Sequence, residues 1–480
     1  MRLGALVLVP ILGAVAAYFD APARRSRWLV GAALLHLAMV AWAWGSPPAT
    51  SAIGWLRFEP LGGLVLTLVS VVFVAVAFYA VGYLRREDPR GGRAFVSALL
   101  AFLASASMVS LTHHFGLLWV GMEATTLTTA PLIYDPRDRH SLDAVWKYLL
   151  VCSVGIAIAL LGTFFLATAQ LAATRGGGAA LVLEDLVAEA PRFHPVWLRA
   201  AFVLLLVGFG TKMGLAPMHT WLPDAHGEAP SPISALLSGA LLNLAFLAIL
   251  RALQVVNASA HPEFARTLLI GFGLLSVAVA AVFLLGQLKY KRMLAYSSVE
   301  QVGILALGAG LSGTAAWGAL FLMWCGSLAK AALFMSTGSI FIRYGSKRTA
   351  EVTGVGRVLP LTAVLLAVGL FAVSGSPPFG TFLGEIALLS GAIRTGRLGV
   401  AVAVLALQAA IFASMAAAIF GMVLGRPAAE VVSARGPEDR WLTLPPLVLL
   451  AGAALLGSYL PPALRGAFDA AARAIGGAAP

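Results

Sequence analysis

Four charged residues lie inside long apolar stretches of this 480-residue chain. Glu123 follows LLWVGM, Lys212 follows VGFGT, Lys330 follows CGSLA and Glu385 follows FGTFLG. A charge at the centre of a membrane-spanning helix costs about 2.5–3.5 kcal/mol, so such residues usually face the protein interior and mark an ion path. Because carboxyl and amino groups exchange protons, the four residues predict proton movement across a bilayer.

Two further charged residues lie closer to the ends of their apolar stretches. Glu300 occurs in AYSSVEQVGIL and Lys147 in AVWKYLLV. Both are candidates for the same path, and both could instead be interfacial residues whose charged ends reach the headgroups. For Glu123, Lys212 and Glu385 the alternative is a structural ion pair. That alternative is costly, because desolvation offsets most of the attraction in a buried pair.

Alternating acids and amines suggest a mechanism. A lysine beside a carboxylate holds its proton more tightly, and a lysine left alone in apolar surroundings releases it more readily. We expect Glu123 to modulate Lys212, water and polar side chains to connect Lys212 to Lys330, and Glu385 to pass the proton on.

The composition indicates which elements must position these residues. The chain is 60% hydrophobic and 11% charged, with a mean hydropathy of +0.90, whereas soluble domains contain roughly 25% charged residues. The sequence therefore predicts an all-α polytopic membrane protein with about fourteen spans of near 20 residues. These lie near 3–19, 28–44, 61–84, 94–113, 115–134, 145–170, 198–218, 231–255, 267–288, 293–312, 314–343, 359–390, 399–424 and 441–459.

The basic residues orient these spans. Loops after the odd-numbered spans carry 20 Lys and Arg residues, the termini and other loops carry 11, and Lys212 and Lys330 lie inside spans. The positive-inside rule makes the 20-residue side cytoplasmic and places both termini outside. The net charge of +12 is thereby explained by loops near anionic lipid, and it does not indicate nucleic-acid binding.

Two spans are predicted to be broken, within an internal repeat. Gly210, Gly214 and Pro217 surround Lys212, and a Gly/Pro segment precedes Glu385. Spans 4–8 (94–255) can be laid over spans 9–13 (267–424), between an N-terminal part (1–93) and a last span with the tail (441–480). The overlay pairs Glu123 with Glu300, Lys147 with Lys330, and Lys212 with Glu385. Since five is odd, the repeats enter from opposite sides, as in many transporters.

The loop after span 7 contains acids and histidines but no Lys or Arg. Its sequence, HTWLPDAHGEAPSP, carries His219, Asp224, His226 and Glu228, and its prolines argue against a plain helical hairpin. This cytoplasmic loop could be a proton entry, or a packed and capped turn.

No motif for a metal or cofactor is present. Cys152 and Cys325 are isolated thiols in apolar stretches, whereas an iron–sulfur cluster usually needs four ligands. The eight histidines show no ligand-like clustering. His36 is expected to be a core residue, and His113 and His114 to be interfacial. We therefore expect no cofactor in this chain and no electron transfer by it.

Several of these segments resemble a known family. GMEATTL, WKYLL, GTKMGLAPMHTWLPDAHGEAPSPISALLSG, KRMLAYSSVEQVGIL and SGSPPFGTFLGE are similar to the antiporter-like subunits of respiratory complex I and of multisubunit sodium/proton antiporters, above all to the F component of hydrogenase-4. The resemblance runs from about span 3 to span 13. It implies fourteen helices with two inverted five-helix repeats in a bacterial or archaeal cytoplasmic membrane.

The resemblance also assigns roles. Glu123 would be the helix-5 glutamate, Lys212 the broken-helix lysine, Lys330 the helix-11 lysine and Glu385 the ionisable residue of helix 12. Partners would be sister membrane subunits and a peripheral redox arm holding the iron–sulfur, nickel or flavin groups. Whether the chain counts as an enzyme depends on that complex, because the redox site would lie elsewhere.

The chain departs from the family pattern at three positions. Asn243 occurs where many relatives have a lysine or histidine, and Gln301 and Gly326 occur where histidines are common. Asn and Gln orient water but hold no proton near neutral pH. Central transfer would then depend more on water, or this copy would conduct poorly.

Four functions are compatible with these residues. The first is a proton-translocating subunit of a redox-driven complex of the hydrogenase-4, formate hydrogenlyase or NADH:quinone oxidoreductase type. The second is a cation/proton antiporter subunit without redox chemistry. The third is the membrane subunit of an inorganic-carbon uptake system with a soluble zinc partner, and the fourth is a structural subunit that no longer pumps.

Overall fold

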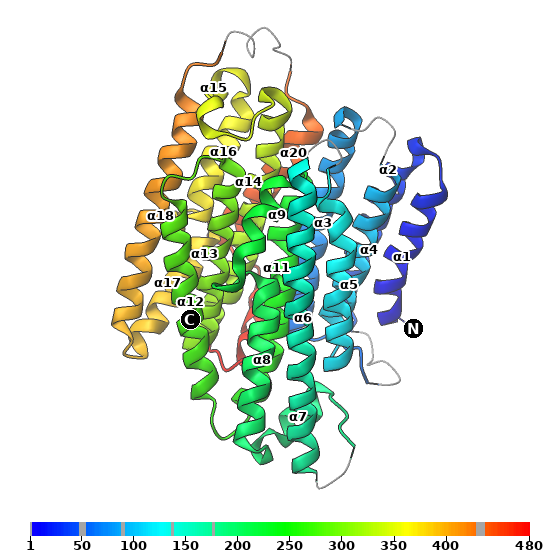
Figure 1. Ribbon diagram of the computed structural model, residues 1–480, viewed down its shortest axis with the longest axis vertical. Coiled ribbons are helices and arrows are strands. Elements are labelled where there is room, and N and C mark those ends of the chain that lie inside the picture. Colours follow the sequence, from blue (N-terminus) through cyan, green and yellow to red (C-terminus); the bar gives the residue numbers. More distant parts are fainter. Residues whose placement is uncertain (1, 48–53, 88–91, 136–138, 175–177, 429–436) are drawn as a thin grey trace.

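The structure is a computed structural model that describes residues 2–47, 54–87, 92–135, 139–174, 178–428 and 437–480. It is a bundle of helices that run mostly along its long axis (Figure 1). In the described part of the chain, β-type pairing is limited to isolated bridges. The all-α prediction is confirmed.

The N-terminal part consists of three helices. They are α1 (Arg2–Phe19), α2 (Pro22–Gly45) and α3 (Pro60–Glu87). The helices α2 and α3 begin at a proline, whose fixed φ angle and missing N–H suit the first helical position.

The next helices correspond to the first predicted repeat. They are α4 (Arg93–Leu111), α5 (Phe115–Ile133), α6 (Arg139–Ala173), α7 (Leu183–Glu189), η1 (Ala190–Arg192), α8 (Pro195–Met213), η2 (Met218–Trp221), α9 (Leu222–Glu228), α10 (Ser231–Leu236), η3 (Leu237–Leu241) and α11 (Leu242–Asn257). The segment η3 is one turn of π-helix inside the span formed by α10 and α11.

The remaining helices correspond to the second predicted repeat and the C-terminal part. They are α12 (Glu263–Leu284), α13 (Tyr290–Leu311), α14 (Gly313–Tyr344), η4 (Thr349–Glu351), α15 (Val355–Val358), α16 (Pro360–Val373), α17 (Gly380–Arg394), α18 (Leu398–Leu424), α20 (Arg440–Ser458) and α21 (Pro462–Ala474). Corresponding helices of the two sets make corresponding contacts: α4 packs on α5 as α12 packs on α13, and α6 packs on α8 as α14 packs on α17.

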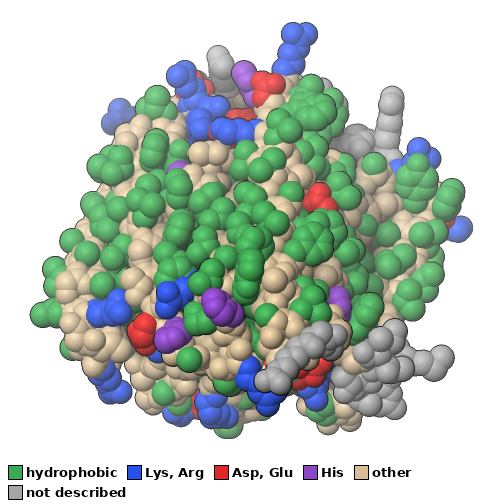
Figure 2. Space-filling view, turned by 60° about the horizontal axis from the view of Figure 1, so that its bottom comes forward, with side chains coloured by type: hydrophobic (Ala, Val, Ile, Leu, Met, Phe, Trp, Pro, Cys, Tyr) green, Lys and Arg blue, Asp and Glu red, His purple; other side chains and the backbone are tan. Residues whose placement is uncertain are grey.

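The helices are those of a multi-pass membrane protein. Among the described residues, eleven helical segments are long and apolar enough to cross a bilayer, and α1 and α16 are shorter apolar helices. The nineteen-residue α5 accounts for the remaining predicted span. Figure 2 shows hydrophobic side chains over the middle of one face, with most Lys and Arg towards its two ends. A surface with this much exposed apolar area fits lipid contact.

Both predicted breaks are present. The helix α8 ends at Met213, and Gly214 has φ +84°, a left-handed conformation that glycine adopts without strain. A Cβ atom at position 214 would also collide with Leu222. The second break separates α16 from α17, and Gly375 within it has φ +66°.

The centre of the bundle is formed by the segment from α10 to α11, by α13 and by α14. Nearly every residue of these helices is buried, whereas α18 exposes most of its surface. Polar side chains on the central helices therefore need partners from the protein or from internal water.

Four details were not predicted correctly or not foreseen. The connection between spans 6 and 7 contains α7, whose Leu183 and Leu186 are buried. The prolines after span 7 permit a helix, because Pro223 occupies the first turn of α9. The tail after the last span forms α21. Arg251, counted above with a loop, is 1% exposed within α11 because backbone carbonyls and an acid surround its guanidinium.

Candidate functional site

Glu123 and Lys212 are connected by a hydroxyl group. The Lys212 ammonium donates to Thr126 Oγ1 at 2.7 Å, and Thr126 Oγ1 lies 3.4 Å from Glu123 Oε2. Thr126 lies three residues after Glu123, so both occupy one face of α5. Lys212 is completely buried and Glu123 is half-buried. The carboxyl group thus influences the lysine through an intervening hydroxyl.

A second hydroxyl group binds the same lysine. Lys212 donates to the Tyr148 hydroxyl at 2.7 Å, and that hydroxyl lies 2.6 Å from Thr129 Oγ1. The other carboxyl oxygen of Glu123, Oε1, accepts a hydrogen bond from the Ser153 hydroxyl at 3.0 Å. Lys212 lies in the last turn of α8, where the negative end of the helix dipole favours a cation.

Neighbouring positions on α6 point in different directions. Tyr148 is buried against Lys212, whereas Lys147 points to the rim of the bundle. Its ammonium donates to Asp224 at 2.6 Å, and its side chain is 44% exposed. Successive helical residues are separated by about 100°. Sequence reasoning selected Lys147 for its charge, but the structure places Tyr148 at the buried lysine.

Hydroxyl and amide groups occupy the centre of the bundle. Ser238, in the π-helical turn, lies 2.9 Å from Ser298 on α13. Asn243 donates to the Gly239 carbonyl and to Ser327 Oγ, both at 2.8 Å. The Asn243 amide, at the position of a common lysine or histidine, is therefore held by the helices beside it.

A second buried lysine lies between α14 and α13. Lys330 is 1% exposed and hydrogen-bonds Ser297 Oγ. Glu300, one turn after Ser297 on α13, is 6% exposed, and its charge interacts with that of Lys330. Glu300 is thus buried near Lys330, an arrangement that the sequence did not predict.

Glu385 is bound by a residue that the sequence did not single out. Gln408 on α18 donates from Nε2 to Glu385 Oε1 at 3.0 Å. Gly375 packs so closely on the Glu385 carboxyl group that a Cβ atom at position 375 would collide with it. We call these residues the polar axis: Glu123, Thr126, Tyr148, Lys212, Ser297, Lys330, Glu300, Gln408 and Glu385.

The polar axis crosses the width of the bundle. Its members lie first on α5, α6 and α8, then on α13 and α14, and finally on α17 and α18. In Figure 1 these three groups of helices follow one another from the right side to the left. The arrangement can hold and transfer protons at several buried points between opposite edges of the protein.

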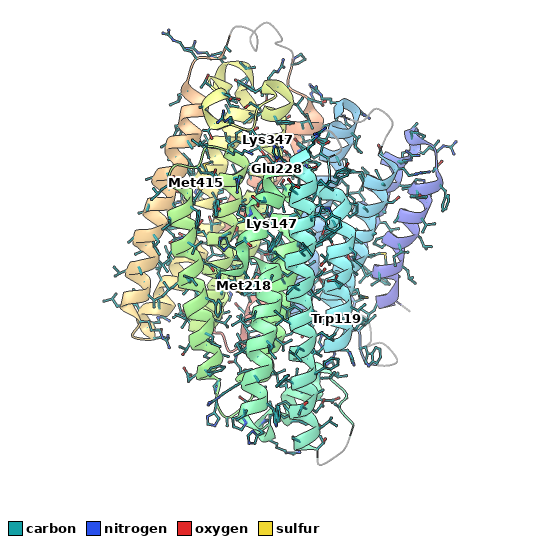
Figure 3. The ribbon with its side chains drawn as sticks, in the orientation of Figure 1. Trp119, Lys147, Met218, Glu228, Lys347 and Met415 are labelled. Atoms are coloured by element: carbon teal, nitrogen blue, oxygen red, sulfur yellow. The ribbon has the colours of Figure 1, made fainter. Side chains whose placement is uncertain are left out.

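The loop after α8 meets cations from other helices at the end of the bundle that carries α15. Asp224 pairs with Lys147 and, at 2.7 Å, with Arg292. Glu228 pairs with Lys289 and Lys347, and Figure 3 places Glu228 beside Lys347 at that end, above Lys147. The loop contains no Lys or Arg of its own, yet Asp224 and Glu228 each pair with two basic side chains from other parts of the chain.

A cavity of about 550 Å³ opens beside this loop. Its lining includes Asp135, His140, Glu228, Lys289 and Lys291. Lys291 is buried, and its ammonium hydrogen-bonds the Ala229 carbonyl. The cavity therefore leads from the basic end of the bundle to buried polar groups.

The two histidines of the loop differ in environment. His226 is completely buried, and its ring stacks on Phe334 with centroids 5.0 Å apart. Phe334 lies one turn after Lys330 on α14. His219 lies near the aromatic rings of Phe283 and Tyr296. His226 therefore packs on a side chain that lies one turn from Lys330.

Gln301 fills the space that Gly326 leaves. A Cβ atom at position 326 would lie 2.7 Å from the Gln301 Nε2 atom. The two departures from the family pattern are therefore in contact, and each accommodates the other.

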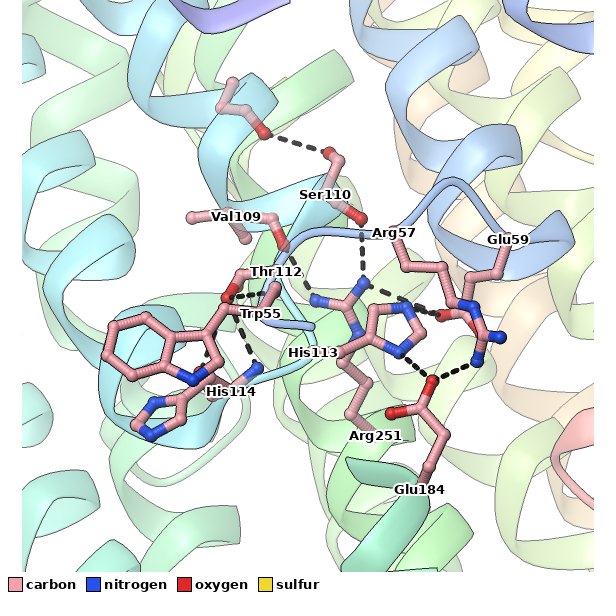
Figure 4. A network of polar contacts seen from close by, with 11 residues as sticks. Trp55, Arg57, Glu59, Val109, Ser110, Thr112, His113, His114, Glu184 and Arg251 are labelled. Carbon is pink, nitrogen blue, oxygen red and sulfur yellow. Dashed lines mark hydrogen bonds and ion pairs between the residues drawn. The ribbon is translucent and has the colours of Figure 1, made fainter. Parts of the chain in front are cut away.

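A second polar network lies at the opposite end of the bundle (Figure 4). His113 lies 3.3 Å from Glu59 and 2.9 Å from Glu184, and Arg57 pairs with Glu184 at 2.5 Å. Arg251 donates to the Val109 and Ser110 carbonyls and lies 3.6 Å from Glu59. The sequence suggested an interfacial His113, whereas the structure buries it between two acids.

Sequence reasoning missed the uncharged members of the polar axis. Tyr148, Thr126, Ser297 and Gln408 carry no charge, and hydroxyl residues are common in helices. The available signal was their position within three or four residues of a buried charge, or, for Gln408, a lone amide in an apolar span. In the part of the chain that the structure describes, no three His, Cys, Asp or Glu side chains form a group suited to a metal ion.

Comparison with known proteins places this geometry in a family. Residues 112–412 match the model of the NADH:quinone oxidoreductase/Mrp antiporter transmembrane family. The chain is 33% identical over 408 residues to a hydrogenase-4 component F homolog of Methylacidiphilum infernorum, with 82% of this chain and 84% of that protein aligned. It is 28% identical to hydrogenase-4 component B of Escherichia coli, of which it spans only 53%.

A solved structure shows the same fold. A chain of the membrane-bound sulfane sulfur reductase, an archaeal respiratory membrane complex, aligns with a TM-score of 0.88 at 23% identity, covering 99% of this chain and 98% of that one. The polar axis, the broken helices and the family match agree, and the chain belongs to the NADH:quinone oxidoreductase/Mrp antiporter transmembrane family.

Proposed function

We propose that this chain is the proton-translocating subunit of a redox-driven membrane complex of the hydrogenase-4 or NADH:quinone oxidoreductase type. The observation that carries the proposal is the polar axis, in which two buried lysines and three carboxyl groups lie across an otherwise apolar bundle. Burying ionisable groups in a membrane protein costs free energy, and the groups that are buried usually mark an ion path. The names of the relatives, hydrogenase-4 components and a respiratory complex, support the redox context.

Proton transfer would proceed through the three parts of the axis. Lys212 gives up a proton towards the centre, leaving a neutral amine that the Thr126 and Tyr148 hydroxyls can still bind. Water and the serine pair Ser238–Ser298 bridge to Lys330. Lys330 then exchanges its proton with Glu300, and Glu385 receives it at the far edge. Each step moves one proton between named groups, and none requires a cofactor in this chain.

The entry of protons would lie at the cavity beside Glu228 and Lys291. Several charged side chains line the open cavity. His226 stacks on Phe334, which lies one turn after Lys330 on α14. By the positive-inside rule the end of the bundle that carries α15 faces the cytoplasm of a bacterial or archaeal cell, with both termini on the outer side.

Partners would adjoin the two edges where the polar axis ends. Glu123 and Ser153 at one edge, and Glu385 and Gln408 at the other, are only half-buried, so a neighbouring membrane subunit would complete their burial. The iron–sulfur, nickel or flavin groups would belong to a peripheral arm. The related solved complex supports partners within the membrane.

Two substitutions test the proposal. In inverted vesicles of the native membranes, Glu123→Gln and Lys212→Ala should abolish proton uptake while the complex still assembles. Glu263→Gln, whose side chain is 71% exposed, is the matched control and should pump normally. Unchanged uptake in both axis variants would overturn the proposal.

The second candidate is a cation/proton antiporter without redox chemistry, because the family description itself includes Mrp antiporters. Gentle extraction of the complex with metal analysis distinguishes the two. Iron–sulfur subunits indicate a redox-driven pump, and nickel narrows it to a hydrogenase. Small membrane subunits without redox metal indicate the antiporter, and a single soluble zinc partner indicates inorganic-carbon uptake.

A further inference from the structure

We propose that the groove between α2, α3 and α20 binds an acyl chain of an anionic phospholipid, and that Arg85 and Arg440 bind the phosphate of the same lipid. The inference concerns the lipid-facing surface and does not depend on proton transfer through the polar axis. It names a binding groove, the class of its ligand and the two side chains that select this ligand.

The groove lies between three helices on the outside of the bundle. The helix α3 packs on both α2 and α20, and a cavity of about 470 Å³ is lined by all three. Apart from Arg440 its lining is apolar, with Leu37 on α2 and Phe78 on α3 among its members. On α20 the lining runs from Trp441 to Leu449, which is about 12 Å along the helix. A narrow apolar space of this length suits a hydrocarbon chain.

The groove is open towards lipid. Leu444 and Val448, both in its lining, are each 57% exposed. Val74 and Phe78, in its lining on α3, are half-buried. Exposed apolar side chains of this kind, on a helix long and apolar enough to cross a bilayer, fit contact with lipid. Acyl chains are therefore the hydrocarbon that is available to fill the groove.

Trp441 marks the level of the lipid headgroups. Its indole ring stacks on Phe78 with centroids 6.0 Å apart, and a Cβ atom at position 82, where α3 has a glycine, would collide with it. The close approach at Gly82 fixes the indole against α3. Because tryptophan rings favour the boundary between membrane and water, the groove extends from the headgroup level at Trp441 towards the middle of the bilayer.

Two guanidinium groups lie at this boundary. Arg85 lies 5.1 Å above the centre of the Trp441 ring, and Arg440 precedes Trp441 and lines the cavity. Both side chains are exposed, and among the described residues neither pairs with a carboxylate. A guanidinium group stacked on an aromatic ring keeps N–H groups that can donate in its own plane. Arginine binds phosphate with two parallel hydrogen bonds, so one lipid phosphate can be held by both residues.

The acids beside these arginines already have partners. Asp439 pairs with Arg86 at 3.2 Å and accepts from the first turn of α20. Glu438 accepts from two backbone N–H groups at the start of α16. The opening of the groove therefore keeps an excess of positive charge. This charge attracts a headgroup with a net negative charge and repels the ammonium group of a zwitterionic headgroup.

The opening lies at the end of the bundle that carries α15. Glu438, two residues before Arg440, is bound to the start of α16, and Tyr83, two residues before Arg85, lines the cavity beside Glu228. By the positive-inside rule this end faces the cytoplasm. The lipid then belongs to the cytoplasmic leaflet, where anionic headgroups and basic side chains attract each other.

Photo-crosslinking of the native complex in phosphatidylcholine vesicles tests the site. Phosphatidylglycerol and phosphatidylcholine, each with a diazirine on an acyl chain, are compared at equal concentration, and the labelled peptides are identified by mass spectrometry. Phosphatidylglycerol should label residues 441–449 about tenfold more strongly than phosphatidylcholine, because two arginines bind its headgroup. Equal labelling by the two lipids would overturn the inference. So would a segment 441–449 without label while α1 is labelled, because another subunit would then cover the groove.

Variants separate the headgroup from the acyl chain. Replacing both arginines, Arg85→Gln with Arg440→Gln, should remove the preference for phosphatidylglycerol and leave labelling by phosphatidylcholine unchanged. Leu444→Trp narrows the groove but keeps both guanidinium groups, and it should reduce labelling by both lipids. Arg348→Gln removes an arginine that is 63% exposed in the connection between α14 and α15, and this matched control should keep the preference. A preference that survives in the double arginine variant would refute the role of these residues.

Thermal unfolding supplies a second readout. A ligand that binds the folded protein raises its melting temperature, so phosphatidylglycerol added to the detergent-solubilised complex should stabilise the natural protein and Arg348→Gln more than the double arginine variant. An equal rise in all three would contradict the proposal. If the double variant fails to assemble, the comparison of the two lipids on the natural protein still decides, because it requires no substitution.

Discussion

Single side chains decide how the first buried lysine communicates with its carboxylate. Thr126 lies between Lys212 and Glu123 and contacts both, so the two charges interact through a hydroxyl group and not through a direct ion pair. Such an arrangement weakens the attraction that would otherwise trap the proton on the lysine. The hydroxyl at position 126 should therefore matter for transfer more than its lack of charge suggests.

A substitution pair at this position tests that expectation. Thr126→Val has nearly the same shape but no hydroxyl, and it should slow proton uptake by about tenfold because Lys212 loses one acceptor and its link to Glu123. Thr126→Ser restores the hydroxyl and should recover most of the rate. Thr168→Val, at an exposed hydroxyl of α6, is the control. Equal rates for the valine and serine variants would contradict the expectation.

At the scale of elements, the broken helix sets the position of Lys212. The helix α8 ends one residue after Lys212, and Gly214 in the left-handed conformation redirects the chain into the segment of η2 and α9. The break places Lys212 in the last turn of a helix inside the bundle, where the negative end of the helix dipole favours a cation. The same sequence as an unbroken helix would carry Lys212 with no such partner.

A glycine substitution tests the break. Gly214→Ala should lower the free energy of unfolding by about 1–3 kcal/mol, because alanine is strained at φ +84° and its methyl group would meet Leu222. Gly271→Ala, inside α12 with open space around its Cβ position, should be neutral or slightly stabilising. Thermal unfolding in detergent measures both, and equal melting temperatures for the two variants would refute the strain argument.

The polar network shown in Figure 4 connects four parts of the fold. Glu59 precedes α3, His113 follows α4, Glu184 lies on α7 and Arg251 on α11. Burial by itself would raise the pKa of Glu59, but the close contact with His113 and the charge of Arg251 outweigh it, and the pKa lies below its usual 4.5. Burial likewise acts to raise the pKa of Glu184, but the charge of His113 outweighs it and the pKa is lowered.

These lowered pKa values predict acid sensitivity. A carboxyl group with a lowered folded-state pKa contributes its stability fully above the ordinary value of 4.5 and loses it as the pH falls through the lower value. Glu59→Gln should therefore cost about 1–3 kcal/mol at pH 7, and the difference from the natural protein should shrink below about pH 4. Melting temperatures from pH 7 to pH 3 provide the measurement. A difference that stays constant over this range would contradict the prediction.

On the scale of the whole molecule, the apolar surface and the two charged ends define how the protein sits in a bilayer. Large hydrophobic side chains are exposed along the outer helices, and most Lys and Arg side chains on the face in Figure 2 lie towards its two ends. The central helices α13 and α14 are almost entirely buried, so the middle of the polar axis is surrounded by outer helices, whereas its two ends lie at the edges of the bundle.

Cysteine labelling tests this orientation. The natural cysteines, Cys152 and Cys325, are buried, so the background should be low. Arg348→Cys, at a side chain that is 63% exposed, should react with a membrane-impermeant maleimide only from the cytoplasmic side. Glu263→Cys, at a position that is 71% exposed, should react only from the outer side. Labelling of both from one side would refute the topology.

The sequence by itself determined the class of the protein and the main charged positions. Low charge and long apolar runs leave a bundle of spanning helices as the available solution, because backbone groups in lipid must be satisfied internally. The glycines and prolines near Lys212 and Glu385 determined the two breaks. The burial of Lys212 and Lys330, and the partial burial of Glu123 and Glu385, follow from the same cost of exposing charge to lipid. None of this requires knowing which helices touch.

The tertiary structure alone decided which uncharged groups complete the site. The inward direction of Tyr148 and the outward direction of Lys147 depend on how α6 is rotated against α8, and the sequence pattern of an almost wholly apolar helix does not encode that rotation. The meeting of Gln408 with Glu385 depends on the packing of α18 against α17. Hydrogen bonds act over about 3 Å, so partners far apart in the sequence become apparent only when the helices are packed.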